Sequence, residues 1–214
     1  MKTPIRLSPI FDRLQSLKGN WREINGMPCL TETDNDFPTL GMADLSCLTR
    51  CGFKGAGAAE WLQSQGLPVP DRPNSWLSLP EGGIIARLGI SEFLIEDNLE
   101  SAISPRLINQ SVPAQVYPVL RQYLAIALCG NSIDELMRQT GNVNFSALPL
   151  TEAPVVLTSM IGVSVTIIPG EQIYRIWCDG TFGVYFWQTL LEIVAEIGGG
   201  TIGAERFFDL VSIS

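Results

Sequence analysis

Histidine is absent from the 214-residue sequence. Its absence excludes catalysis by an imidazole base and any metal site with a histidine ligand. Basic residues are also few, because 14 Lys and Arg stand against 22 Asp and Glu, which gives a formal net charge of -8. A chain of this charge repels phosphate backbones and anionic lipid. We therefore expect neither nucleic acid nor a membrane surface as its partner.

Charged residues as a whole are scarce, at 17% of the chain with a mean hydropathy of +0.20. This composition indicates that another subunit covers some apolar surface. The longest uncharged stretch, Ala153 to Gly170, contains Pro154 and Gly162 and is rich in Val and Ile. It predicts two buried strands joined by a turn near Gly162, not a membrane helix. Met1 to Arg13 has no apolar run of signal-peptide length, so we expect a cytoplasmic protein.

The cysteines are odd in number and scattered, as is typical of reduced thiols in a cytosolic protein. They are Cys29, Cys47, Cys51, Cys129 and Cys178. Only Cys47 and Cys51 are close in sequence, and no second pair or histidine completes a set of metal ligands. We expect five core thiols and no metal site.

Prolines and polar residues in positions 1-38 predict an irregular N-terminal arm. A helix is predicted from Gly55 to a stop at Gly66. The prolines of Ser101 to Pro118 indicate a linker with at most a short helix. Runs of β-branched and aromatic residues bounded by turn residues predict the strands of the chain. The predicted strands are 76-79, 83-88, 92-96, 123-129, 155-161, 163-168 and 173-178.

Two further helices are predicted in the second half. Ser132 and Glu135 have capping-box spacing and open a helix that ends at Gly141. The second runs from Phe182 to Ile197 with Thr181 as its N-cap. Gly198-Gly199-Gly200 follows a helix and not a strand, which favours a helix stop and flexible hinge over a phosphate loop. Residues 201-214 are predicted to be a C-terminal tail.

The two halves of the sequence have similar residues at corresponding positions when the sequence is shifted by 73 to 75 positions. The shift aligns the segment Gly55 to Gly66 with Gly130 to Gly141, and Leu88-Gly89 with Ile161-Gly162. The predicted fold is therefore α+β, with two pseudo-repeated βαββ-type units in a body that spans residues 39-200. Repeat one covers about 40-100 and repeat two about 119-200.

The spacings resemble those of the aminomethyltransferase family, the T protein of glycine cleavage. The resemblance covers roughly Leu40 to Gly198, and the compactness of the chain is most similar to the gamma subunit of heterotetrameric sarcosine oxidase. The segments that carry it are 44-46, 55-62, 83-85, 87-89, 92-94, 130-137, 174-176 and 182-191. The resemblance implies the two-repeat fold of the family's folate-binding domain.

Departures from the family's pattern concern the residues that contact folate. Ala86 and Arg87 stand where the resemblance implies a paired aspartate, one of which holds the folate amine, and alanine cannot accept that hydrogen bond. Glu171 is similar to one of two folate-contacting glutamates, but Arg175 stands near the place of the second. Glu171 is thus the one candidate cofactor contact, and a solvated turn residue is the favoured interpretation. No catalytic residue is predicted.

The resemblance implies a non-catalytic gamma-type subunit of a sarcosine oxidase or a related complex that oxidises N-methyl amines. Its partners would be larger flavoprotein subunits, which would hold FAD, FMN and tetrahydrofolate, with no cofactor bound by this chain. One alternative is a stand-alone folate-dependent one-carbon transferase that uses Asp44 or Glu92 instead. The purely structural interpretations are that Asp44 caps a turn with Ser46 and that Glu92 is a strand-edge charge. A free-standing interaction scaffold is the third alternative.

Overall fold

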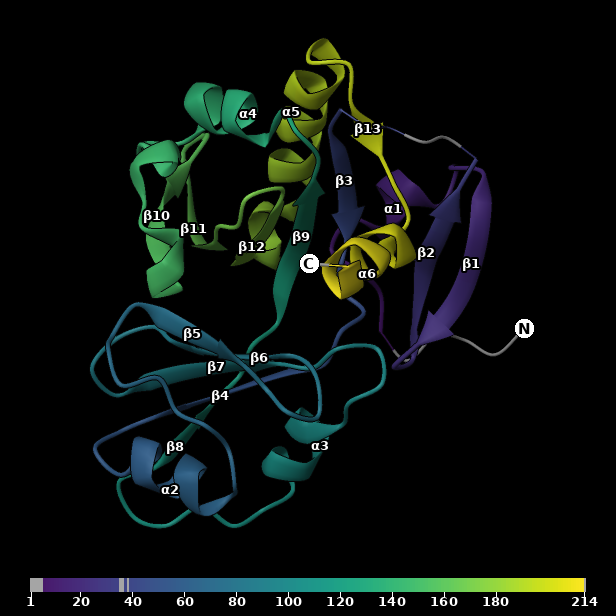
Figure 1. The fold of residues 1–214 in the computed structure, drawn as a ribbon. Helices are drawn as coiled ribbons and strands as arrows, with labels where there is room; N and C mark the ends of the chain where they lie inside the picture. Colours follow the sequence, from purple (N-terminus) through teal and green to yellow (C-terminus); the bar gives the residue numbers. More distant parts are fainter. Residues whose placement is uncertain (1–5, 35–36, 38, 214) are drawn as a thin grey trace. The chain divides into compact units, whose positions relative to one another are not determined.

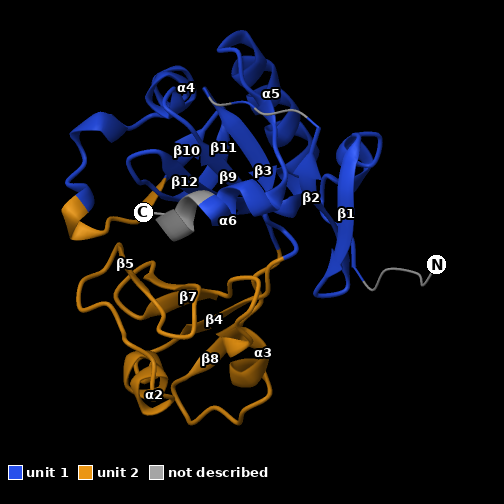
Figure 2. Cartoon of the chain, turned by 45° about the vertical axis from the view of Figure 1, so that its right-hand side comes forward, with its two compact units in different colours: residues 1–47, 123–150, 158–214 blue, residues 48–122, 151–157 orange. Residues whose placement is uncertain are grey.

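The computed structural model describes residues 6-34, 37 and 39-213, and it has the predicted α+β class (Figure 1). Contacts divide the chain into two compact units, coloured separately in Figure 2. Unit 1 comprises residues 1-47, 123-150 and 158-214, and unit 2 comprises residues 48-122 and 151-157. Unit 2 is thus almost a single insertion between the early and late parts of unit 1.

Unit 2 contains a five-stranded antiparallel sheet in the order β5-β6-β7-β4-β8. Helices α2 and α3 complete it. The bounds are β4 (Arg50–Lys54), α2 (Ala58–Ser64), β5 (Ser75–Ser78), β6 (Ile84–Arg87), β7 (Glu92–Glu96), α3 (Ile103–Ile108) and β8 (Tyr117–Val119). Alternate strand residues such as Phe53 and Ile95 face the helices and bury Trp61 and Leu107 in one apolar core.

Unit 1 is built on a six-stranded sheet in the order β10-β11-β12-β9-β3-β13. Strands β13 and β3 pair in parallel, whereas β11 with β12, β12 with β9 and β3 with β9 pair antiparallel. The bounds of its strands are β3 (Gly41–Asp44), β9 (Tyr123–Cys129), β10 (Val156–Met160), β11 (Val163–Ile168), β12 (Ile173–Asp179) and β13 (Gly200–Thr201). The helices that pack on it are α4 (Ile133–Thr140), α5 (Gly183–Glu196) and α6 (Ala204–Ile213). Three short 3-10 turns are η1 (Phe145–Ala147), η2 (Leu150–Glu152) and η3 (Gly180–Phe182).

Neighbouring residues of β12 identify the two faces of this sheet. Tyr174 packs against Phe145, which lies beside α4, whereas the Arg175 guanidinium lies 4.8 Å from the centre of the Phe207 ring in α6. Successive side chains of a strand point to opposite faces. Helix α6 therefore covers the face opposite to α4, and Figure 1 shows α6 crossing in front of β3 and β9.

The two larger sheets share a strand order, since β5-β6-β7-β4 in unit 2 corresponds to β10-β11-β12-β9 in unit 1. Gly55 follows β4 with a φ of 119°, and Gly130 follows β9 with a φ of 131°. Their N–H groups donate to corresponding carbonyls, those of Ser91 before β7 and Gln172 before β12. Each sheet thus has a β-α-β-β-β order of elements, while the predicted boundaries of a sequence repeat stay a prediction.

The prediction of an irregular N-terminal arm is wrong within the described residues. Helix α1 (Phe11–Leu14) precedes a hairpin of β1 (Gly19–Ile24) and β2 (Met27–Thr33). Asn25 and Gly26 form its turn with φ values of 51° and 74°, the backbone that a two-residue hairpin loop requires. Pro28 is tolerated in β2 because a two-stranded sheet has only edge strands. The predicted C-terminal tail likewise contains α6.

The glycine run after α5 does stop the helix, but the prediction of a flexible hinge is wrong. Gly198 has a φ of 86°, and the N–H of Gly199 donates to the Val194 carbonyl at 2.8 Å. A Cβ at Gly199 would collide with the Leu40 carbonyl, and the N–H of Gly200 donates to that carbonyl at 3.0 Å. The glycines are therefore required by close backbone packing.

Both predicted helix caps differ in detail. Asp179, and not Thr181, caps the turn that leads into α5, because its carboxylate accepts the Thr181 N–H at 2.8 Å. Ser132 is the N-cap residue of α4, yet its side chain makes no capping hydrogen bond. The predicted capping box therefore marks the start of the helix without forming.

The five cysteines are buried and free, as predicted. Among the described residues, no helix is long and apolar enough to cross a membrane.

Candidate functional site

Ala86 and Arg87, which the sequence resemblance predicts to stand in the place of the folate-contacting aspartates, lie on β6. Ala86 is fully buried there and pairs with Trp76 on one side and Leu94 on the other. A methyl group among apolar side chains offers no oxygen to an amine. An aspartate in this place would also be a buried charge, which is costly without a partner.

Arg87, the next residue, binds the unit's own backbone. Its guanidinium donates to the carbonyls of Pro70 at 2.9 Å, Asp71 at 2.8 Å, Gly89 at 3.3 Å and Ile90 at 2.6 Å. It also lies 5.5 Å from the centre of the Phe93 ring. Arg87 is thus a structural clamp between two loops. The residues at this position do not fit the folate role of the family.

The other sequence-predicted candidates are not brought together. Glu171 is exposed in the turn between β11 and β12. Asp44 caps a turn as predicted, because its Oδ1 accepts the Ser46 N–H at 2.9 Å. Glu92 lies on β7, an inner strand, and its Oε1 accepts from Arg121 Nη2 at 2.5 Å. The prediction that Glu92 is a strand-edge charge is therefore wrong.

Unit 2 contains a buried polar cluster around Asp97, the residue after β7. Asp97 accepts from the Thr49 hydroxyl at 2.5 Å and from the Ser104 N–H at 3.1 Å, so it caps the first turn of α3. Burial raises the pKa of the Asp97 carboxyl, and hydrogen bonds from Thr49 and Ser104 oppose the shift. Burial also raises the pKa of the neighbouring Cys51 thiol to about 12. A protonated, buried thiol is inert, which assigns this cluster to stability.

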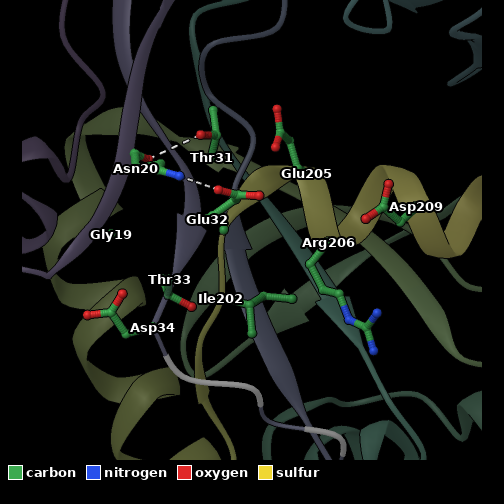
Figure 3. A pocket seen from close by; sticks show the side chains of 11 residues that line it. Gly19, Asn20, Thr31, Glu32, Thr33, Asp34, Ile202, Glu205, Arg206 and Asp209 are labelled. Carbon is green, nitrogen blue, oxygen red and sulfur yellow. Dashed lines mark hydrogen bonds between the residues drawn. The ribbon is translucent and has the colours of Figure 1, made fainter.

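A hollow of about 440 Å³ lies in unit 1 between the β1–β2 hairpin and the start of α6 (Figure 3). Its charged lining is mostly acidic and consists of Glu32, Asp34, Glu205, Arg206 and Asp209. Several polar groups already have partners, since Asn20 donates to Glu32 and Arg22 pairs with Glu205. No group of three or more acidic or cysteine side chains among the described residues is placed to hold a metal ion.

This hollow was not predicted, because positions 1-38 were expected to be an irregular arm and positions 201-214 a C-terminal tail, whereas β1, β2 and α6 form its walls. The Asn25-Gly26 pair is a hairpin signal that could have found the first wall. The spacing of Ala204, Phe207 and Leu210 could have suggested the second.

Large apolar side chains are exposed in both units. Ile90 in the loop clamped by Arg87 is 82% exposed. At the start of α5, Phe182 and Tyr185 are 52% and 54% exposed. Such exposed anchors are typical of surfaces that bind another protein.

The molecule is thus an α+β chain with large apolar side chains exposed on both of its units. Comparison of its sequence with known protein families and with characterised proteins finds no match.

Solved structures do resemble it. The aminomethyltransferase T of the glycine cleavage system from Bartonella henselae has a TM-score of 0.71 at 14% identity, over 94% of this chain. This chain spans 60% of the length of that protein. A heterotetrameric sarcosine oxidase from Corynebacterium sp. U-96, solved with pyrrole 2-carboxylate, has a TM-score of 0.64 at 17% identity, and the match covers 90% of this chain and 96% of that one. The chain therefore has the aminomethyltransferase-like fold.

Proposed function

We propose that this chain is a non-catalytic, gamma-type subunit of a heterotetrameric sarcosine oxidase or of a related flavoenzyme complex that oxidises N-methyl amines. Its role would be to assemble with larger subunits, which would hold FAD, FMN and tetrahydrofolate.

The observation that carries the proposal is the state of the folate position. Ala86 is buried among apolar residues, and the guanidinium of Arg87 is occupied by backbone carbonyls of its own unit. A transferase of this fold would need a carboxylate there to orient the reacting amine. A subunit that supports assembly has no such requirement.

The surface of the chain supports the same proposal. Exposed apolar side chains such as Ile90 and Phe182 fit a chain that is partly covered in a complex.

The alternative is a stand-alone folate-dependent one-carbon transferase that uses Asp44 or Glu92. Asp44 is engaged with the Ser46 backbone, and Glu92 is paired with Arg121. Neither carboxylate is prepared for a substrate amine, which disfavours this alternative.

Purification of the tagged chain from its native host tests the proposal. We expect larger chains that carry a flavin absorbance near 450 nm, and oxidation of sarcosine or a similar N-methyl amine by the purified complex. A monomeric chain that is stable without flavoprotein partners would contradict it. Genes for such subunits next to this one would be an independent observation in its favour.

Calorimetric titration of the isolated chain with tetrahydrofolate separates the proposal from its alternative. A non-catalytic subunit should give no binding heat. Micromolar binding that is abolished by Asp44→Asn or Glu92→Gln would favour the transferase.

A further inference from the structure

Helices α4 and α5 lie side by side on one face of the six-stranded sheet, in both views (Figures 1 and 2). Their inner residues, such as Leu136 and Leu190, are buried. We call the exposed residues of α4, α5 and the turn before α5 the helical face, and it consists of Asp134, Glu135, Arg138, Gln139, Asp179, Thr181, Phe182, Val184, Tyr185, Gln188, Glu192, Ala195 and Glu196.

Two aromatic side chains of the helical face are exposed in a fixed setting. Phe182 and Tyr185 are three residues apart, so they lie on neighbouring positions of one helix side. The Tyr185 hydroxyl donates to the Ile161 carbonyl at 3.1 Å, which anchors the ring while half of the side chain stays exposed. Gly183 between them is buried, and a Cβ there would lie 3.0 Å from Pro9. A prearranged aromatic loses little entropy when a partner covers it.

Charge on the helical face is almost entirely of one sign. Acidic side chains are exposed at five positions, which are Asp134, Glu135, Asp179, Glu192 and Glu196. Arg138 is the one basic residue of the helical face, all of whose residues are described. Along the sequence, the only Lys or Arg between Arg138 and Arg206 is Arg175, which lies over Phe207 on the opposite side of the sheet.

We propose that the helical face docks onto a partner protein whose surface has an apolar pocket with a rim of lysine and arginine. Phe182 and Tyr185 enter the pocket, and carboxylates of the same face, such as those of Asp179 and Glu192, meet the basic rim. This inference rests on the proposed function for the identity of the partner, which is a larger subunit of the same complex.

The negative charge of the helical face favours a basic protein partner over a second copy of the chain, nucleic acid or anionic lipid. A second copy of the chain would bring five carboxylates against five, and juxtaposed like charges oppose association. Nucleic acid and anionic lipid are repelled for the same reason. A basic, apolar protein surface is attracted at long range and then buries the two rings.

The test is site-specific photo-cross-linking of the full-length chain in its native host. A benzophenone amino acid replaces Phe182 in one variant and Gln63, an exposed polar residue of α2 in unit 2, in the matched control, which should give no cross-link. We expect a cross-link from position 182 to one partner, in a peptide flanked by lysine or arginine. A cross-link to a second copy, to an acidic peptide, or to nothing would overturn the inference.

Charge reversal provides a second readout. Glu192→Lys with Glu196→Lys should reduce the amount of co-purified partner at least about tenfold, as should Phe182→Ala with Tyr185→Ala. Glu60→Lys with Glu100→Lys, two exposed positions in unit 2, is the matched control and should leave the partner bound. Thermal melting of each variant checks that the chain still folds. Equal partner binding by folded reversal and control variants would contradict the inference.

The two proposals fail separately. A basic partner without flavin, cross-linked through position 182, would contradict the proposed function and leave the helical face assigned. A flavin-containing partner cross-linked only through position 63 would support the proposed function and contradict the docking of the helical face.

Discussion

Arg50 and Glu96 lie directly opposite each other on β4 and β7, with Arg50 Nε 2.5 Å from Glu96 Oε2. Only 3% of the Arg50 side chain and 1% of the Glu96 side chain are exposed. Arg50 also donates to the Leu48 carbonyl at 3.1 Å. Two buried charges are therefore tied to each other and to the start of the five-stranded sheet.

Removal of one partner should cost more than removal of both. Arg50→Met or Glu96→Leu leaves the other buried charge without its partner, and we expect a loss of about 3 to 5 kcal/mol in the free energy of unfolding. The double variant Arg50→Met with Glu96→Leu should cost less than the sum of the single changes. Urea denaturation of all four proteins measures this, and additive losses would contradict a coupled buried pair.

The raised pKa of Asp97 predicts that the free energy of unfolding depends on pH. Because burial raises this pKa above its unfolded value near 3.8, the folded state binds the proton more tightly than the unfolded state does. The contribution of Asp97 is then present at low pH and is lost as the pH rises through the folded pKa. Asp97→Asn should remove this part of the slope. Unfolding free energies of both proteins between pH 3 and 7 provide the test, and parallel curves would refute it.

Gly130 should tolerate no side chain. Its φ of 131° strains any L-residue, and a Cβ would collide with the Thr39 carbonyl. We expect Gly130→Ala to cost about 3 kcal/mol or more in the free energy of unfolding, and Gly55→Ala to behave alike because its Cβ would meet the Gln115 carbonyl. Gly89→Ala is the control, since nothing lies within 4 Å of its added Cβ. Similar melting temperatures for all three variants would show that these turns relax freely.

Helix capping gives a comparison within unit 1. Asp179→Ala removes the acceptor for the Thr181 N–H before α5 and should cost about 1 kcal/mol. Glu135→Ala should cost only a few tenths, because Ser132 makes no side-chain capping bond at α4. Denaturant midpoints rank the two variants. A larger loss for Glu135→Ala would indicate that the capping box forms in solution.

Some helices and strands were predictable from sequence, because their apolar residues and the turn residues that flank them lie close together in the chain. Strands β7, β9 and β11 have the bounds that their apolar runs and the flanking turn residues predict. Helix α5 was predicted within one residue at each end, because Phe186 and Leu190 repeat at helical spacing and Gly198 has the positive φ of a helix stop. Residues within and next to such an element therefore determine where it begins and ends.

Other elements depend on partners far away in the sequence. Strands β3 and β13 have four and two residues and exist because Gly200 and Thr201 pair with Gly41 and Met42. No local pattern shows this pairing. The roles of Arg87 and Glu92 were equally hidden, since the first depends on carbonyls of Pro70 and Asp71 and the second on Arg121. At the candidate site, the sequence alone shows only that position 86 carries no carboxylate.

The place of β3 has a consequence for the newly made chain on the ribosome. This strand is synthesised before all of unit 2, yet it pairs with β9 and then with β13, close to the C-terminus. Unit 2, with most of its residues in one continuous segment, can fold while β3 still has both edges open. Unpaired strand edges promote misassembly. A chain whose translation stops before Tyr123 would therefore carry β3 with neither of its neighbouring strands, and this open strand could pair with strands of other chains.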